Sequence, residues 1–213
     1  MTRWCVLVPL KSLTHAKSRL GHLPISCRQA LVVAMARDVR DAVLSCPAVE
    51  ELVVVTSEPR LHDLLSAHGV RFVADSPSDS LNQALRRGAA SCRSRPDSGL
   101  AALTADLPAL TANELEHALY LAVHTPTSFV PDAGGKGTTM FAARSSEEFL
   151  PQFGHRSRAR HIAAGAKELL WPGMMGIRQD VDTVEDLERA WALGIGQHSR
   201  AVAADLTAGC SAP

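Results

Sequence analysis

The sequence predicts an α/β fold with a mostly parallel central sheet that is covered by helices. Short apolar runs such as residues 5–9 (CVLVP) and 52–56 (LVVVT) alternate along the chain with segments of helical periodicity. The runs are rich in β-branched residues, which favour strands, and they are apolar enough to be buried on both faces. The 213 residues suit one domain. We assign residues 1–196 to it and expect a poorly structured tail over residues 197–213.

The remaining elements are predicted from their own local signals. Ser26 is expected to cap the first long helix, and Thr111 with Glu114 and Thr183 with Asp186 have the spacing of capping boxes. The other predicted strands lie at residues 70–74, 100–104, 128–131 and 139–143. The other predicted helices lie at residues 61–68, 80–90, 111–123, 157–170 and 183–194, with Gly194 as the stop of the last one.

Composition excludes several classes of protein. Lys and Arg together number 22, as do Asp and Glu, and a net charge near zero argues against a general nucleic-acid binder. No apolar run approaches the length of a membrane span. The five cysteines are scattered, with no CxxC pair and no zinc-finger spacing, which favours free thiols in a reducing compartment. We therefore expect a cytoplasmic protein with neither a nucleic acid nor a membrane as its partner.

Three cations follow the first predicted strand. Lys11, Lys17 and Arg19 lie within nine residues of one another, in the loop where α/β sheets gather ligands beyond the carboxyl ends of their strands. Cations placed there stabilise a bound triphosphate and the charge that develops on leaving pyrophosphate. The chain has no GxxxxGK[ST] motif, so a P-loop is excluded. A solvated basic loop is the alternative interpretation.

Two acidic segments predict a metal site. Asp106 directly follows the strand at residues 100–104, and Asp180 and Asp182 share one face if their segment is extended. Close carboxylates without a basic partner repel one another unless a cation joins them. Carboxylate oxygens suit Mg²⁺, so Asp106 and Asp180 are its candidate ligands. The alternatives are that Asp106 stabilises a turn and that Asp182 or Thr183 caps the last helix.

Three further segments are candidates for ligand contact. The glycines of residues 134–139 (GGKGTT) allow backbone N–H groups to approach an anion, and Thr138 adds a hydroxyl donor. Gly154 and Ser157 precede a predicted helix whose first N–H groups favour phosphate or carboxylate. Asn82, in the first turn of another helix, is a candidate for reading a base or ribose. The alternatives are a hairpin turn and an ordinary helix cap.

The ordered set of these motifs resembles the guanylyltransferases of coenzyme F420 biosynthesis. The matching stretches are VPLKSLTHAKSRL, DSLNQAL, TADLPAL, GGKGTTM, FGHRSRARH and QDVDTVEDL, and they span roughly residues 6–190. The resemblance implies a single-domain, Rossmann-like nucleotidyltransferase fold. It also implies Mg²⁺ as cofactor, with GTP and a small phosphorylated acid as substrates.

The same resemblance implies a reaction and a set of residues. GMP would move from GTP to phosphoenolpyruvate, with 2-phospho-L-lactate and 3-phospho-D-glycerate as alternative acceptors, and the product would pass to a deazaflavin-conjugating transferase. The implied residues are Thr138, Gly154 and Ser157 for the phospho-acid, Asp106 and Asp180 for the metal, and Lys11, Lys17 and Arg19 for the nucleotide and catalysis.

Some features weigh on the choice among related functions. Lys136, Arg156 and Arg158 depart from the family pattern and add positive charge near the predicted acceptor, which affects the acceptor's identity. A transferase that makes sugar nucleotides or a molybdopterin dinucleotide would open with a glycine-rich loop, but no glycine precedes Gly21 here. A non-catalytic nucleotide-binding module would not need two separated acids for a metal.

Overall fold

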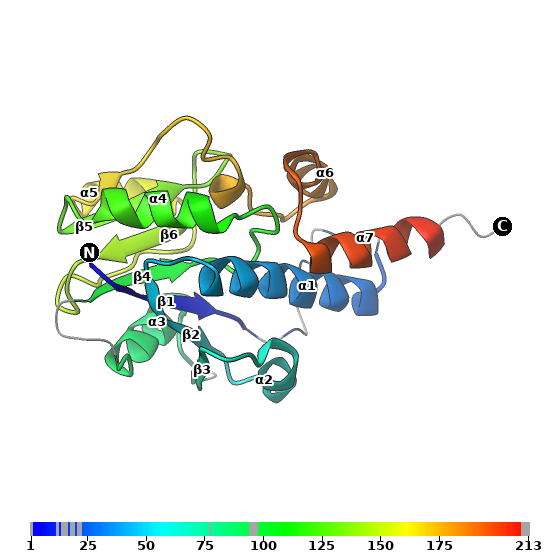
Figure 1. The fold of residues 1–213 in the computed structure, drawn as a ribbon, viewed down its shortest axis with the longest axis horizontal. Helices are drawn as coiled ribbons and strands as arrows, with labels where there is room; N and C mark the ends of the chain where they lie inside the picture. Colours follow the sequence, from blue (N-terminus) through cyan, green and yellow to red (C-terminus); the bar gives the residue numbers. More distant parts are fainter. Residues whose placement is uncertain are drawn as a thin grey trace.

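The computed structural model describes residues 2–11, 13, 17, 20, 23–76, 78–93 and 98–209, without the side chains of residues 205–209. Within these residues the fold is a seven-stranded sheet in the order β3-β2-β1-β4-β6-β5-β7 (Figure 1). The strands are β1 (Trp4–Pro9), β2 (Val49–Val55), β3 (Val70–Val73), β4 (Gly99–Leu103), β5 (Thr127–Pro131), β6 (Thr138–Ala143) and β7 (Lys167–Glu168). Among the strands in the described part of the chain, only β6 runs antiparallel to its neighbours, so the prediction of a mostly parallel sheet is confirmed.

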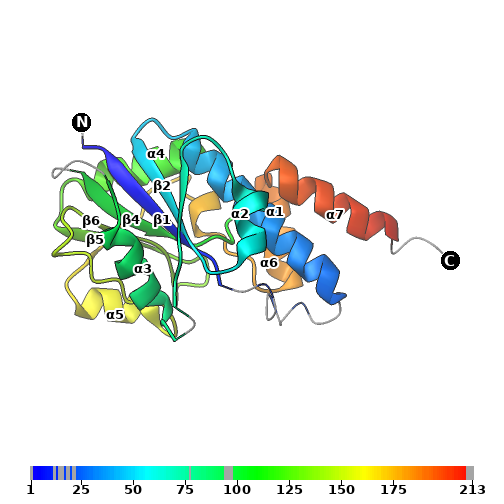
Figure 2. The ribbon, with the colours of Figure 1, turned by 90° about the horizontal axis from the view of Figure 1, so that it is seen from below.

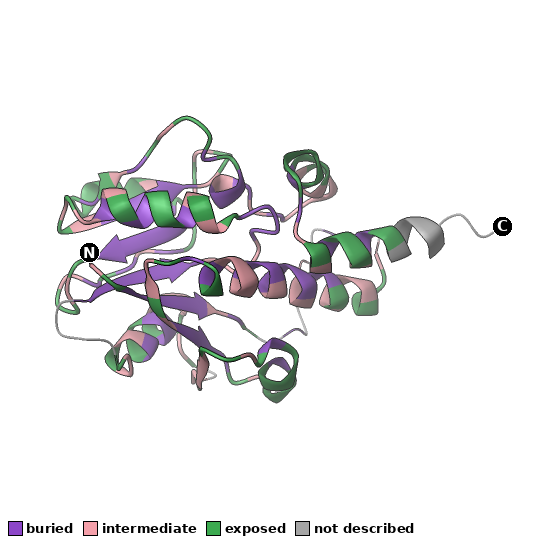
Figure 3. Cartoon of the chain, in the orientation of Figure 1, coloured by how far each residue is buried: buried purple, intermediate pink, exposed green. Residues whose placement is uncertain are grey.

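Helices cover both faces of this sheet (Figure 2). They are α1 (Ile25–Leu44), α2 (Pro59–Leu65), α3 (Leu81–Ala90), α4 (Ala112–Ala122), α5 (Ser157–Ala163), α6 (Val184–Leu193), α7 (Gln197–Gly209) and the short 3₁₀ turn η3 (Gly176–Arg178). Apolar residues of α1 and α4 pack on one face, and apolar residues of α3 pack on the other. The helices are buried where they face the strands and exposed on their outer sides (Figure 3).

The central strand β1 explains why the sheet needs helices on both sides. Trp4, Val6 and Val8 point into the core beneath α1 and α4, whereas Cys5 and Leu7 point into the core beneath α3. All five are at most 3% exposed. A strand that is apolar on both faces is stable only when both faces are covered.

One edge of the sheet gathers the segments that carry polar chemistry. β1, β4 and β5 are parallel to one another, so the loops that follow them leave the sheet at the same edge. β6 is antiparallel and begins at that edge, where the Thr104 N–H donates to the Thr139 carbonyl over 2.9 Å. The segment before α6 reaches the same place, because the Val181 N–H donates to the Asp106 carbonyl over 3.1 Å.

Several predicted helix ends differ from the structure. Pro24, and not Ser26, precedes α1, and no side chain caps that end. A proline at this position supplies a fixed φ but has no side-chain oxygen that could accept from the first N–H groups of the helix. The helix predicted over residues 157–170 ends at Ala163, because Gly165 has a φ of +83° and the chain then enters β7. The capping boxes at Thr111 and Thr183 are confirmed.

The prediction of a poorly structured tail is wrong for residues 197–209, which form α7 against α1. The Asp38 carboxylate accepts hydrogen bonds from the backbone N–H groups of His198 and Ser199, at 3.0 and 2.9 Å. These are first-turn donors of α7 that have no partner within the helix. Ala203 then joins an apolar cluster with Leu31. A buried acid on α1 therefore starts the helix, and the tail's own composition does not reveal this.

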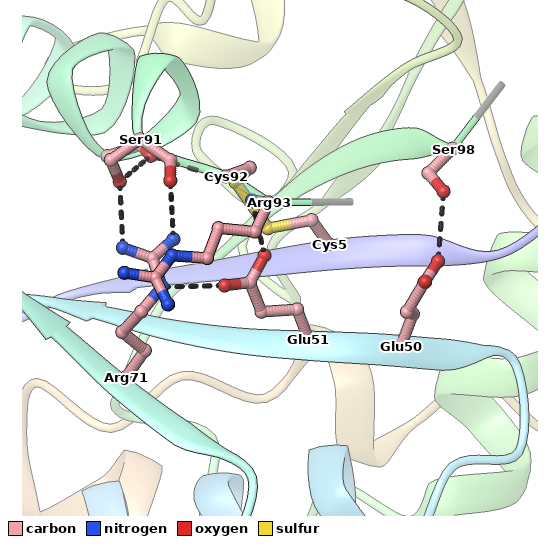
Figure 4. The surroundings of a disulfide bond; sticks show 9 residues. Cys5, Glu50, Glu51, Arg71, Ser91, Cys92, Arg93 and Ser98 are labelled. Carbon is pink, nitrogen blue, oxygen red and sulfur yellow. Dashed lines mark hydrogen bonds and ion pairs between the residues drawn. A yellow bond between two sulfur atoms is a disulfide. The ribbon is translucent and has the colours of Figure 1, made fainter. Parts of the chain in front are cut away.

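The prediction of free thiols is wrong for two of the cysteines. Cys5 of β1 and Cys92, just after α3, form a disulfide with their Cα atoms 6.8 Å apart (Figure 4). They are 87 residues apart in sequence, so no spacing rule could pair them. The close approach of α3 to β1 depends on Gly88, where an added Cβ would lie 2.7 Å from a Leu7 side-chain carbon. Arg71 fixes the same corner, bonding the Glu51 carboxylate at 2.6 Å and the Ser91 carbonyl at 2.8 Å.

Candidate active site

A lysine between carboxylates occupies the edge of the sheet beyond β1 and β4. The Lys17 ammonium contacts Asp106 Oδ2 at 2.5 Å and Asp182 Oδ1 at 2.9 Å. Burial disfavours the charged form of Lys17, but Asp106 and Asp182 outweigh that effect and hold its pKa above its usual value. The sequence-predicted nucleotide loop and metal site therefore meet at one point.

Asp180 adds a carboxylate that has a strongly perturbed pKa. Burial, followed by the negative charges of Asp106, Asp132 and Asp182, raises its pKa from 3.8 to about 7. A carboxyl group in such surroundings is easily ionised only if a further cation is present. Sequence reasoning missed the part of Asp132 in this cluster. The available signal was its position directly after β5, which matches the position of Asp106 after β4.

The donor set of this cluster fits a divalent cation. Asp106 Oδ1 is buried and has no hydrogen-bond partner among the described residues, while its other oxygen contacts Lys17. A buried carboxylate oxygen without a partner is costly unless a ligand satisfies it. Carboxylate oxygens are hard donors of the kind that Mg²⁺ and Mn²⁺ take. Asp106 and Asp180 are therefore residues that could hold such a cation.

A second cation of the predicted nucleotide loop, Lys11, lies away from the carboxylate cluster. The Lys11 ammonium donates to the Asp79 carbonyl at 2.8 Å, next to the start of α3. Asp79 also accepts a hydrogen bond from Arg87 at 3.0 Å. Lys11 thus faces α3 rather than the carboxylate cluster. Arg19 lies outside the described residues, so its predicted role has no structural counterpart here.

The glycine-rich turn between β5 and β6 is organised by Asp132. Its carboxylate accepts from the Lys136 N–H at 2.8 Å, and its backbone N–H donates to the Gly137 carbonyl at 3.3 Å. A Cβ at Gly137 would lie 2.5 Å from Asp132 Oδ2, so glycine is required for this close approach. The site thus has two halves, the carboxylate cluster around Lys17 and the glycine-rich turn with α5. Asp132 belongs to both, since it closes the turn and its charge acts on Asp180.

The turn leads directly to Thr138, which is tied to α5. Thr138 is 7% exposed, and its Oγ1 lies 3.0 Å from Nδ1 of the buried His161. One turn earlier in α5, Ser157 is 2% exposed, and its N–H donates to the Gly154 carbonyl at 3.0 Å. The three residues predicted to bind the phospho-acid are thus brought together through α5. Gly154 has a φ of +116°, a conformation that L side chains rarely adopt.

At the start of α5, part of the predicted anion site is already hydrogen-bonded within the protein. The N–H of Ser157 donates to Gly154 and the N–H of Arg158 donates to the Lys136 carbonyl at 3.2 Å. Two of the first-turn donors that an anion would use are therefore already engaged. The helix is also only seven residues long, which limits its dipole. Side chains and the glycine-rich turn are the other groups near α5 that could contact an anion.

Asn82, predicted to read a base or ribose, is hydrogen-bonded to the main chain in this structure. Its amide nitrogen donates to the Phe153 carbonyl at 3.0 Å, and its oxygen accepts from the Phe153 N–H at 2.9 Å. The edge of the side chain that would pair with a base is therefore occupied by the main chain. Asn82 positions the loop before α5, and Arg160 supports it with a hydrogen bond to the same carbonyl at 2.8 Å.

A basic cavity adjoins the turn and α5. Its volume is about 470 Å³, and its lining residues are Gly135, Lys136, His155, Arg156, Arg158, Ala159 and Ile162. Arg158 is paired with Glu168 through two contacts of 3.0 and 3.1 Å, whereas Lys136 and Arg156 are exposed. Lys136, Arg156 and Arg158 therefore share one surface. A second cavity, of about 620 Å³ between α1, α2 and α7, contains none of the clustered acids.

The fold is that of nucleotidyltransferases of the nucleotide-diphospho-sugar transferase type. A Desulfovibrio desulfuricans protein assigned to that group superposes with a TM-score of 0.74 at 16% identity, covering 98% of this chain and 96% of its own. A nucleotidyl transferase from Methanothermobacter gives a TM-score of 0.64 at 20% identity, covering 89% and 96%. These likenesses concern the fold. Among the described residues, no helix combines the length and apolar character needed to cross a membrane.

Sequence comparison gives the family. The model of the CofC-like guanylyl transferases matches residues 4–208, and the chain belongs to that family. The phosphoenolpyruvate guanylyltransferase of Streptomyces avermitilis is 50% identical over 206 residues, covering 96% of this chain and 95% of the relative. The enzyme of the same name from Thermomonospora curvata is 47% identical, covering 96% and 90%.

Proposed function

We propose that this guanylyltransferase transfers GMP from GTP to phosphoenolpyruvate in coenzyme F420 biosynthesis, with Mg²⁺ held by Asp106 and Asp180. The observation that carries the proposal is the meeting of Lys17, Asp106, Asp180 and Asp132 beside the turn that leads to Thr138. This arrangement offers a metal-binding side and an anion-binding side that share one residue. The relatives described above carry this activity in their names.

The reaction joins two anions, so charge neutralisation is the main requirement. A phosphate oxygen of the acceptor forms a bond to the α-phosphorus of GTP, and the bond from that phosphorus to the bridging oxygen breaks, releasing pyrophosphate. Two unit charges roughly 4 Å apart repel by about 4 kcal/mol at an effective dielectric of about 20. Bound Mg²⁺ would supply a Lewis acid that offsets this repulsion.

The chain's own residues have distinct parts in this scheme. Lys17 places a permanent positive charge next to Asp106, where the triphosphate of GTP would lie. Thr138 offers a hydroxyl donor to the acceptor, and Lys136 and Arg156 surround that position with positive charge. Acceptor phosphate oxygens are already ionised near neutral pH, so no general base is needed. Catalysis then consists of positioning and electrostatic stabilisation.

The test is a panel of nucleotides and acceptors. GTP, ATP, CTP and UTP are each combined with phosphoenolpyruvate, 2-phospho-L-lactate or 3-phospho-D-glycerate, with Mg²⁺ or with EDTA, and pyrophosphate and product mass are measured. We expect Mg²⁺-dependent formation of enolpyruvyl-diphospho-guanosine. A faster reaction with another acid would reassign the acceptor, and GTP binding without any product would favour a non-catalytic nucleotide-binding module.

The product chemistry suggests where the enzyme works. A diphosphate-linked conjugate is an activated donor, and a deazaflavin-conjugating transferase is the expected recipient. We expect both steps in the cytoplasm, where GTP is available. Co-purification or direct transfer between the two enzymes, measured in the presence of a competing trap for free product, tests the hand-off.

A further inference from the structure

His161 is a buried histidine with both ring nitrogens engaged. The side chain is 0% exposed, and its ring stacks on Phe141 and Phe129 with centroid distances of 4.9 and 5.4 Å. Its Nε2 lies 2.9 Å from the backbone nitrogen of Gln152, and its Nδ1 lies 3.0 Å from Oγ1 of Thr138. The imidazole therefore links α5 to the loop before it and to the start of β6.

These partners determine which nitrogen carries the proton. A backbone N–H can only donate, so Nε2 must accept from Gln152 and has no proton of its own. Burial, with a smaller contribution from the charge of Arg160, lowers the pKa of His161 from 6.5 to about 4. The ring is therefore neutral near pH 7, and its single proton is on Nδ1. Consequently the Thr138 hydroxyl accepts from Nδ1 and cannot donate to it. The Ser157 backbone also hydrogen-bonds to the ring, and this contact opposes the lowering of the pKa.

We propose that His161 is a positioning residue that directs the hydroxyl hydrogen of Thr138 toward the anionic acceptor. A hydroxyl has one hydrogen and two lone pairs. When a lone pair of Oγ1 accepts from Nδ1, the hydrogen remains for another partner, and a phosphate or carboxylate takes only donors. The opposite tautomer would attract that hydrogen and turn a lone pair toward the anion. This inference rests on the proposed function, in which Thr138 binds the acceptor.

Matched substitutions separate the two ring nitrogens. His161→Gln supplies an acceptor where Nε2 lies but no donor to Thr138, whereas His161→Asn supplies a donor where Nδ1 lies but no acceptor for Gln152. Both variants lose the stacked ring. We expect His161→Gln to raise the acceptor KM about tenfold, with the KM for GTP within about twofold of wild type. His161→Asn should recover most of that acceptor affinity.

The pair with Thr138 gives a second kinetic test. Thr138→Val should raise the acceptor KM by a similar factor, and the double variant Thr138→Val/His161→Gln should be no worse than Thr138→Val alone. If the two substitutions raise the acceptor KM independently, so that their factors multiply in the double variant, the proposal is overturned. Equal acceptor KM values in His161→Gln and His161→Asn would also overturn it. If Thr138→Val raises the acceptor KM and His161→Gln does not, the proposed function stands and the positioning role is wrong.

The tautomer can be measured without any substitution. In the intact protein labelled with ¹⁵N-histidine, ring-nitrogen chemical shifts at pH 7 should show a proton on Nδ1 of His161. A proton on Nε2 would overturn the proposal even if the variants fail to fold. Absence of product from the wild-type enzyme with every acid would overturn the proposed function, and the acceptor's part in this inference with it.

Discussion

The two halves of the candidate active site differ in how fully their polar groups are satisfied. At the ends of β1 and β4, Asp106 has a buried oxygen without a partner among the described residues, and the pKa of Asp180 is raised to about 7. At the turn and α5, in contrast, Asp132, Thr138 and His161 have hydrogen-bond partners for the groups that hold the turn and the helix together.

This difference indicates which half of the site depends on a bound ligand. Carboxylates that repel one another are stable only when a cation reaches them, so the first half is suited to binding charge. A network whose donors and acceptors are paired is rigid before any ligand arrives. The second half is therefore suited to orienting an acceptor. Substitutions in each half should therefore have different effects on turnover and on stability.

Asp106→Asn should lower kcat at least a hundredfold, because loss of one preorganised electrostatic group commonly raises a barrier by roughly 3–4 kcal/mol. Asp180→Asn should cause a similar loss of turnover without loss of thermal stability, since its surroundings disfavour the charged carboxylate. Steady-state kinetics and thermal unfolding check both effects. Asp63→Asn, at an exposed position of α2, is the matched control. Near-native turnover of the Asp106 and Asp180 variants would remove the metal assignment.

The second prediction concerns stability in acid and tests the half of the site formed by the turn and α5. The folded pKa of His161, about 4, is below its ordinary value of 6.5. As the pH falls, the unfolded chain therefore takes up the proton first, and stability is lost between these values. The ring faces Phe129, Phe141 and Phe153, and Arg160 is the charge that acts on it. The loss from pH 7 to pH 5 should reach about 2 kcal/mol at most.

Urea denaturation at the two pH values measures this loss. In His161→Gln the difference between pH 7 and pH 5 should shrink by about the same amount, because the titrating ring is gone. His68→Gln replaces an exposed histidine and should leave the difference unchanged. An unchanged pH dependence in His161→Gln would show that other groups cause the acid sensitivity.

Gly137→Ala should cost about 1 to 2 kcal/mol of stability and raise the acceptor KM, because the new Cβ would meet the Asp132 carboxylate at 2.5 Å. Gly134→Ala is the control within the same turn, since its Cβ would lie 3.7 Å from that carboxylate. Denaturant unfolding and acceptor titration compare the two variants. Equal behaviour of both would mean that the Asp132 contact does not organise the turn.

The smallest effect is expected for Asp182→Asn. The Asp182 side chain is 44% exposed, and an exposed ion pair such as its contact with Lys17 is worth less than about 1 kcal/mol. Turnover should therefore fall less than about fivefold. A hundredfold loss of turnover would instead indicate that Asp182 is a metal ligand like Asp106. The half of the site that depends on a ligand would then include Asp182.

Parts of the site could be predicted because their signals are local. Asp106 was predicted from its position after a buried strand, and Thr111 and Thr183 were predicted as caps from the acid three residues on. In contrast, Asn82 and the start of α5 have the composition of ligand sites but satisfy the main chain instead. The distinction depends on the residue across the fold, such as Phe153, and no local pattern contains that information.

The alternation of strands and helices up to α5, the apolar faces of β1 and the ordered motifs of the guanylyltransferase family follow from the sequence alone, because these depend on periodicity and residue type. Only the tertiary structure decided the contacts between distant segments. It paired Cys5 with Cys92, started α7 on Asp38 and placed Lys17 between Asp106 and Asp182. Hydrogen bonds, ion pairs and pKa shifts depend on distances in space, and in a parallel sheet the segments that meet at one edge lie far apart in the chain.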